Sequence, residues 1–271
     1  MSDEVERNSV SWIERIRARS GLFVSKTDSS SASSGLQSTV MGDLVNSGLK
    51  TEGARQAYER SIAKEKQGSK SNLRDQLLDM PLTQLPVVII DLETTGFEPQ
   101  ADAIISIGAW HITGIKWDDQ DSCFYEEVNP GMKIPAHIER LTGISNQMVS
   151  AADSIQDVLP RFLSYVDQRL IIAHGIGHDK SFLRTALWRC QKRTWNYRML
   201  DTMLLAKWLA PQTRPFDLDS VIHHYDIPVS TRHHALEDAK ATGELWIRFV
   251  EQTLAKRVTT LRDMYMYLSR Y

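Results

Sequence analysis

A short apolar run that ends in two closely spaced acids constrains this chain more than any other feature. Residues 86–91 (PVVIID) read as a buried strand after a proline, and Glu93 follows two positions later. Side chains two residues apart in an extended chain leave the same face, so the carboxylates of Asp91 and Glu93 can converge on one point. A divalent cation relieves their repulsion, and hard oxygen ligands suit Mg²⁺ or Mn²⁺. Plain solvation of the pair is the alternative.

The residues that follow predict an α/β domain. Ranges 103–112 and 123–128 read as two further strands, with connections short enough to favour antiparallel pairing. A short buried strand is expected at 170–173, and residues 179–190 continue from it as a helix with one apolar face. The inner stripe of a last domain helix comprises Ala235, Ala239, Thr242, Trp246 and Phe249.

Three stretches are predicted along the chain: an N-terminal extension over 1–85, a compact domain over 86–250 and a C-terminal helix over 251–271. The extension is expected to be partly helical, with a flexible Ser-rich linker near 27–34 (TDSSSASS), and to dock on the main domain or on a partner. Apolar residues of the C-terminal helix follow a 4-3-4-3 spacing. This spacing is compatible with a coiled-coil seam, but so short a helix more often docks back on its domain.

Composition excludes several classes of protein. No apolar run approaches the ~20 residues of a membrane span, and the acidic start (MSDEVERN) lacks the features of a secretory signal, so a cytoplasmic protein is expected. Cys123 and Cys190 make neither a disulfide framework nor a zinc cluster. A net charge of -2 gives no overall attraction for nucleic acid, but residues 180–198 carry six basic residues and no acid. This run fits a solvated helix face and phosphate binding equally well.

Two further acids and two histidines are candidates for chemistry. Asp179 stands at a predicted helix start, where an acid also complements the helix dipole. Asp238 lies beside the apolar stripe of the last domain helix, so it is expected to be poorly solvated and to need a partner such as a metal ion. Hydrolysis near neutral pH needs a base. His233, which precedes the helix on a loop, is preferred for that role over His234, which is expected to pack or to face solvent.

Taken together, these segments resemble the DnaQ-like 3'–5' exonucleases of the DEDDh type, a family that includes polymerase proofreading subunits, ribonuclease T and oligoribonuclease. The resemblance covers residues 87–249, with DLETTG at 91–96, AHGIGHDKSFL around Asp179 and HHALEDA around Asp238. A single DxE is weak, whereas three ordered motifs with matching segments between them are specific. The family's histidine stands five residues before its last aspartate, which selects His233.

The second motif departs from the family pattern at two positions. Gly175 stands where the family commonly has asparagine, and His178 stands where it commonly has an aromatic residue. The metal ligand Asp179 is unaffected. The departures concern how the scissile nucleotide or its neighbour is positioned.

The resemblance implies a ribonuclease H-like fold, in which a mixed sheet of three antiparallel strands followed by parallel strands is flanked by helices. It also implies two-metal hydrolysis of phosphodiesters to nucleoside 5'-monophosphates. The expected metal ligands for two Mg²⁺ or Mn²⁺ ions are Asp91, Glu93, Asp179 and Asp238, with His233 as general base. The expected substrate-binding residues are Thr94, Thr95, Gly96, Phe97, Leu141, Ile144 and His174. Core packing is an equal alternative for the apolar members of this set.

The expected substrate is a single-stranded 3' end, with DNA favoured over RNA. An exoribonuclease of the ribonuclease T or oligoribonuclease kind is the alternative enzyme, and a non-catalytic nucleic-acid-binding scaffold is the alternative from another class. The sequence is compatible with a polymerase or repair partner, and it leaves the oligomeric state open.

Overall fold

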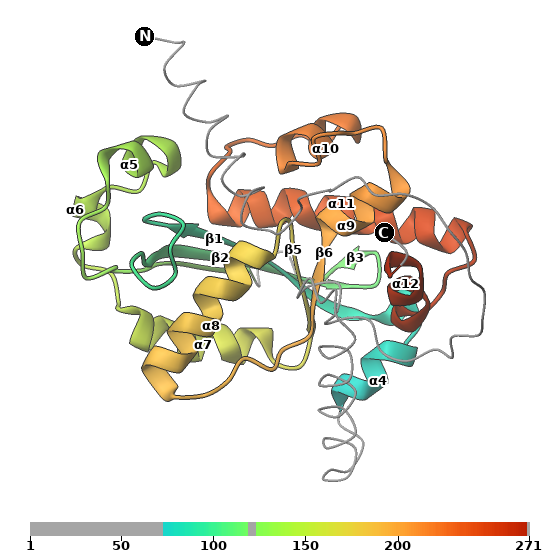
Figure 1. The fold of residues 1–271 in the computed structure, drawn as a ribbon, viewed down its shortest axis with the longest axis horizontal. Coiled ribbons are helices and arrows are strands. Elements are labelled where there is room, and N and C mark those ends of the chain that lie inside the picture. The colour runs from blue at the N-terminus through green and yellow to red at the C-terminus, as the bar shows by residue number, and fades with distance from the viewer. Residues whose placement is uncertain (1–72, 119–122, 270–271) are drawn as a thin grey trace, which may run out of the picture.

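A mixed six-stranded sheet forms the centre of the molecule in a computed structural model, which describes residues 73–118 and 123–269 (Figure 1). The helices and the Ser-rich linker predicted within residues 1–72 lie outside these ranges. The strands are β1 (Pro86–Thr94), β2 (Ile104–Thr113), β3 (Lys116–Trp117), β4 (Phe124–Glu127), β5 (Leu170–Ala173) and β6 (Met199–Asp201).

The sheet has the mixed topology that the family resemblance implies. Its order is β3-β2-β1-β5-β6, and β4 pairs with β2 beside β3. β1, β2 and β4 are antiparallel, whereas β5 and β6 run parallel to β1. The predicted three antiparallel strands followed by parallel strands are therefore confirmed. β3 and β6 are additional strands of two and three residues, too short to show a side-chain period.

The apolar run of β1 is continuous because helices cover both faces of the sheet. Val87 and Ile89 point into one core cluster and Val88 and Ile90 into another, and none of the four is exposed. The helices are α4 (Leu73–Asp79), α5 (Ala136–Thr142), α6 (Asn146–Val149), α7 (Ile155–Val166), α8 (Gly177–Gln191), α9 (Thr202–Leu209), α10 (Leu218–His224), α11 (Ala235–Ala255) and α12 (Leu261–Leu268), with a 3-10 turn at Leu82–Gln84.

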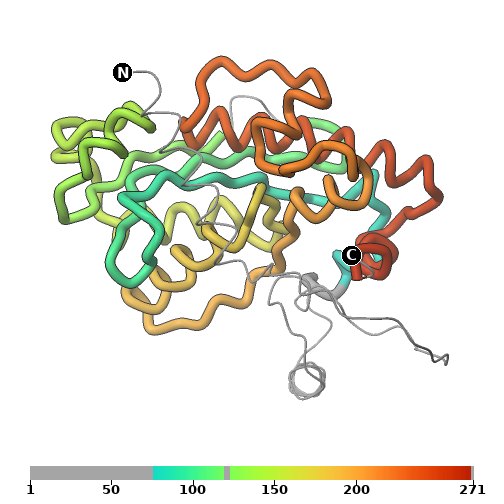
Figure 2. The backbone as a smooth tube through the Cα atoms, turned by 45° about the horizontal axis from the view of Figure 1, so that its top comes forward, coloured from blue at the N-terminus to red at the C-terminus, as the bar shows by residue number. Residues whose placement is uncertain are grey.

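The helices divide between the two faces of the sheet. α7 and α8 cover the face that carries Val88, while α9, α11 and α12 cover the face that carries Val87, as Figures 1 and 2 show from two directions. Among the described residues, no helix is both long enough and apolar enough to cross a membrane.

The C-terminal helix packs against the rest of the molecule. α11 continues to Ala255, past the predicted boundary at 250, and a separate α12 begins at Leu261. The buried residues of α12 share a core cluster with Leu77 of α4, and Arg262 of α12 pairs with Asp79 at 2.6 and 2.8 Å. Docking of this helix, rather than a coiled-coil seam, is therefore confirmed. The division of the whole chain at 85 and 250 stays a prediction.

Candidate active site

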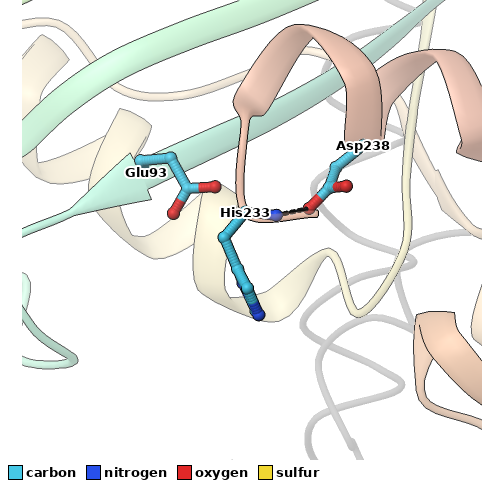
Figure 3. A group of neighbouring side chains, drawn as sticks. All are labelled: Glu93, His233 and Asp238. Carbon is cyan, nitrogen blue, oxygen red and sulfur yellow. Dashed lines mark hydrogen bonds between the residues drawn. The ribbon is translucent and has the colours of Figure 1, made fainter. Parts of the chain in front are cut away.

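Two acids and a histidine from distant parts of the chain meet at the end of β1. Glu93 comes from β1, Asp238 from the first turn of α11, and His233 from the loop before that helix (Figure 3). One possible ligand atom from each residue lies within 4.8 Å of the others. The sequence places Glu93 and Asp238 145 positions apart, so only the packing of α11 on the sheet joins them.

Asp91 and Asp179 complete an acidic centre of four carboxylates, with Glu93 and Asp238. Burial raises the pKa of Asp91 well above its ordinary value, and the neighbouring charges of Glu93, Asp238 and Asp179 raise it further. Burial likewise raises the pKa of Glu93 to about 8 and that of Asp179 to about 8. Asp179, in the first turn of α8, is only 4% exposed, and the backbone amides of Asp179 and Leu92 oppose part of the rise in its pKa.

These residues fit a divalent cation. Crowded and poorly solvated carboxylates favour protons at neutral pH unless a cation neutralises them, and an oxygen-rich donor set is the one that Mg²⁺ and Mn²⁺ prefer. All four predicted ligands contribute to this electrostatic cluster. The number and identity of bound ions stay a prediction.

A glycine allows α11 to approach the sheet closely enough to form the site. Gly108 on β2 is the register partner of Asp91, and a Cβ atom there would lie 2.3 Å from the backbone carbon of Ala235. The indole of Trp110 also donates a hydrogen bond to the carbonyl of Leu236 at 3.0 Å. Together these contacts seat the first turn of α11 over β2, beside the acids of β1.

The two histidines before α11 are held in different ways. His233 has a positive φ of 59°, and its backbone N–H donates to Asp238 Oδ2 at 3.1 Å. Burial and the nearby charge of Arg232 lower the pKa of His233, which favours the neutral imidazole. His234 instead stacks on Tyr125 with ring centroids 4.8 Å apart, so of the two expectations for it, packing or facing solvent, it meets the first.

Arg232 is a site residue that the sequence analysis missed. Its guanidinium forms an ion pair with Asp238, and its Nε atom donates to Asp219 Oδ1 of α10 at 2.5 Å. Its positive charge opposes the rise in the pKa of Asp91 and Glu93. The only available sequence signal was its position directly before His233.

The two threonines after Glu93 hold the loop that follows β1. Thr94 donates to the carbonyl of Gly96 at 2.6 Å, and Thr95 donates to Asp102 Oδ1 at 3.1 Å. A Cβ atom on Gly96 would lie 2.5 Å from that same carboxylate, so the absence of a side chain lets Asp102 close the loop. These residues lie next to the acidic centre, and the contacts that the structure shows are within the protein.

His178 occupies the position of the expected aromatic residue and packs as one. Its ring lies 4.7 Å from that of Phe182 and 5.8 Å, edge to face, from that of Phe97. Its Nε2 atom is 3.2 Å from Thr94 Oγ1. Burial lowers the pKa of His178 to about 4, so the ring is neutral near pH 7. This departure from the family pattern therefore preserves an uncharged ring beside Phe97.

The remaining predicted substrate-binding residues differ in their accessibility. Leu141 on α5 is half-buried, whereas Ile144 is 3% exposed and lies in a small core cluster with Ile105. The ring nitrogens of His174 lie 2.9 Å from Thr202 Oγ1 and 2.9 Å from the carbonyl of Phe216. Core packing is therefore the role that the structure gives Ile144. His174 ties the end of β5 to neighbouring segments, because both of its nitrogens are engaged within the protein.

The fold and the acidic centre define a DnaQ-like nuclease. The sequence profile of the exonuclease family RNase_T matches residues 88–246, more than half of the chain. The chain therefore belongs to this exonuclease family.

Curated relatives include PolC-type DNA polymerase III proteins and a DNA polymerase III subunit. A PolC-type DNA polymerase III of Thermotoga maritima is 35% identical over 177 residues, which are 65% of this chain and 13% of that protein. The epsilon subunit of DNA polymerase III of Aquifex aeolicus is 30% identical over 180 residues, which are 66% of this chain and 85% of that protein. The chain thus spans about an eighth of the PolC-type relative and most of the epsilon subunit.

Solved structures share the fold. Exonuclease X in complex with 5' overhanging duplex DNA aligns with a TM-score of 0.53 and 22% identity, covering 67% of this chain and 99% of the other. Exonuclease I of E. coli in complex with a dT13 oligonucleotide aligns with a TM-score of 0.56 and 18% identity, covering 64% and 43%. At these identities the likeness supports the fold alone.

Proposed function

We propose that this chain is a metal-dependent 3'–5' exonuclease that hydrolyses single-stranded nucleic acid, DNA in preference to RNA, to nucleoside 5'-monophosphates. The observation that carries the proposal is the convergence of Asp91, Glu93, Asp179 and Asp238 at the end of β1, with His233 beside them. Family membership supports an exonuclease. The presence of all five predicted catalytic residues argues against a non-catalytic scaffold.

In this mechanism the four carboxylates hold two Mg²⁺ or Mn²⁺ ions, and when bound these ions supply an activated water and stabilise the leaving oxygen. His233 accepts the proton of the attacking water. Its lowered pKa favours the neutral form that this role needs near pH 7. Its backbone hydrogen bond to Asp238 holds the residue beside the acidic centre.

The preference for DNA and the choice of partner draw on the relatives. The two curated relatives described above are DNA polymerase III proteins, and two solved neighbours were determined with DNA. We therefore propose DNA as the favoured substrate and a polymerase or a repair assembly as the partner. The nucleotide pocket is proposed to include Thr94, Phe97 and the half-buried Leu141.

The full-length protein should be tested with Mg²⁺ and with Mn²⁺ on 5'-labelled single strands of DNA and RNA of the same sequence. A ladder of shortened labelled products is expected, because removal from the 3' end leaves the label on the remaining strand. Release of a labelled mononucleotide at once would instead indicate the opposite direction. Equal rates on the two strands would overturn the preference for DNA.

Site variants test the assignment of roles in the same assay. Asp238→Asn is expected to abolish hydrolysis, and His233→Ala to slow it about 10²- to 10⁴-fold, the range for loss of a general base. Asp153→Asn, at an exposed acid paired with Arg161, is the matched control and should leave the rate unchanged. Wild-type activity in Asp238→Asn would show that the ligand assignment is wrong. Absence of product across metals and substrates would favour the scaffold.

A further inference from the structure

A row of cations with a tryptophan in it lies on the solvent side of α8. From Lys180 onward, the side chains spaced by four residues are Lys180, Arg184, Trp188 and Lys192, which we call the α8 row. Residues four apart on a helix lie above one another on the same face, as Lys180, Arg184 and Trp188 do, and Lys192 follows directly after the end of α8 at Gln191. The first cation is half-buried and the other three members are exposed.

The tryptophan of the α8 row is unusual in its exposure. Trp188 is 55% exposed, the highest value for a large apolar side chain in the part of the chain that the structure describes. Lys192 Nζ lies 6.0 Å from the centre of its ring. An aromatic ring that is open to solvent and flanked by cations has the two components of a single-strand binding surface, a stacking platform and a positive track.

Within the described part of the chain, the cations of the α8 row have no carboxylate partner. Within residues 73–118 and 123–269, no ion pair joins Lys180, Arg184 or Lys192 to a carboxylate, although other arginines such as Arg161 and Arg262 are paired. No acid occurs between positions 180 and 198, in a chain of net charge -2. This concentration of unpaired positive charge complements a polyanion, because phosphates neutralise it and release counterions.

The α8 row also continues from the acidic centre. Asp179 is in the first turn of α8, and Lys180 is the next residue. Lys192 lies thirteen positions after Asp179, which at 1.5 Å per position is about 20 Å. α8 forms the outer layer on its side of the sheet (Figure 1), so a strand that crosses the start of this helix can follow its exposed face. At the 3.4 Å spacing of stacked bases, 20 Å spans about six nucleotides.

We propose that the α8 row is a secondary track for single-stranded nucleic acid, in which the cations contact phosphates and Trp188 stacks on a base. The track rests on the proposed exonuclease function and extends it to nucleotides upstream of the scissile bond. It holds long substrates and is not reached by very short ones. Contacts of this kind are indifferent to sequence, because every nucleotide offers a phosphate and a base face.

The test compares a 20-nucleotide strand with a trinucleotide for wild type, Arg184→Gln/Lys192→Gln and Trp188→Ala, with Mn²⁺. The double variant should raise KM for the 20-mer about 10-fold or more, and Trp188→Ala should raise it about 5- to 100-fold, the range for one stacked base. Both variants should leave kcat/KM for the trinucleotide unchanged. Binding of the 20-mer should also be measured by fluorescence anisotropy without added metal. The slope of the logarithm of the binding constant against the logarithm of salt concentration should be smaller in magnitude by about 1.4 for the double variant.

Matched controls and separate readouts make the test decisive. Two control variants remove exposed side chains elsewhere. They are Arg248→Gln/Lys256→Gln, at a position on α11 and at the residue directly after it, and Met266→Ala on α12. Both should leave the KM for the 20-mer and the salt slope unchanged. An unchanged KM and salt slope for the α8 variants would overturn the track. So would an equal loss on both substrates, since it indicates damage to the acidic centre. If wild type hydrolyses neither substrate, the proposed function fails, and 20-mer anisotropy alone then decides the track.

Discussion

The carboxylate of Asp238 is nearly inaccessible and has a protein partner on each oxygen. Oδ2 accepts the backbone N–H of His233, and Oδ1 is paired with Arg232, whose Nε atom is held by Asp219. Removal of a charged partner from a buried carboxylate leaves its desolvation penalty uncompensated. Arg232 therefore offsets part of the cost of burying the charge of Asp238.

The first prediction concerns this ion pair. Arg232→Gln should lower the free energy of unfolding by about 1–3 kcal/mol in the presence of chelator, as measured by urea denaturation. Mn²⁺ should narrow the difference in free energy of unfolding between wild type and Arg232→Gln, because the ion replaces the missing partner of Asp238. Arg262→Gln is the control, since its pair with Asp79 is on the surface and should contribute at most about 1 kcal/mol. Equal losses in the two variants would contradict the role of Arg232.

The second prediction is a pH dependence of the cation-free protein. The pKa of Glu93 and of Asp179 is about 8 when folded, against ordinary values of 4.5 and 3.8. Between these limits the folded state binds more protons than the unfolded state. The free energy of unfolding in chelator should therefore fall as pH rises from 5 to 8, by up to about 1.4 kcal/mol per pH unit for each group.

Asp179→Asn provides the matched comparison for that titration. This variant should be flatter between pH 5 and 8 than wild type, because one of the two titrating groups is gone. Adding Mg²⁺ should raise the free energy of unfolding of the wild-type protein most at pH 8, because proton loss leaves its carboxylates charged there. The difference in free energy of unfolding between wild type and Asp179→Asn, measured in chelator, should fall as pH rises. A difference that rises with pH would contradict the crowding of the acids.

At the scale of elements, the contact between β2 and α11 positions the site. Three elements carry the acids, namely β1, α8 and α11, and only the last arrives from the far end of the domain. Its first turn lies against the backbone of Gly108, where no side chain intervenes. The separation between Glu93 and Asp238 is therefore set by a close approach between a strand and a helix.

The third prediction tests this approach. Gly108→Ala should displace the start of α11, since the new methyl group would lie 2.3 Å from the backbone of Ala235. Overpacking of this kind costs about 1–3 kcal/mol, and a shift of about 1 Å at a reacting centre can lower kcat about 10²-fold. Thermal unfolding and hydrolysis at 25 °C measure the two effects. Gly177→Ala is the control and should preserve stability, because its Cβ would meet nothing within 4 Å. An equal loss of stability in Gly108→Ala and Gly177→Ala would refute the steric explanation.

At the scale of the whole molecule, the core on the α11 side joins segments from both ends of the described chain. Leu77 and Leu82 lie in one buried cluster with Leu261 and Met264 of α12. The same cluster contains Val87 and Ile89 of β1, the strand that carries the acidic centre. Residues far from the site in sequence thus contribute to the stability of the sheet that supports it.

The fourth prediction follows from this shared core. Leu261→Ala should lower the free energy of unfolding by about 2–5 kcal/mol, because the side chain is fully buried. It should leave kcat at 25 °C within about twofold of wild type, since α12 contributes no residue to the acidic centre. Met266→Ala, at a 42% exposed position of the same helix, should change neither quantity. An unaffected melting temperature in Leu261→Ala would contradict the docking of α12.

The main strands and helices of the domain were predictable from the sequence because their signals are local. The apolar run of β1, the short strand at 170–173 and the helix after Asp179 each depend on neighbours within a few residues. The mixed topology and the four acids followed from the ordered motifs. The strands β3 and β6 escaped prediction because they are shorter than one readable period.

The tertiary structure alone decided which residues contact the acids. The ion pair of Arg232, the close approach at Gly108, and the neutral ring of His178 beside Phe97 all join segments brought together by folding. It also showed Ile144 in the core and both nitrogens of His174 engaged within the protein. One sequence cannot show such contacts, because residue type and spacing record what a side chain can do and only packing determines which partner it meets.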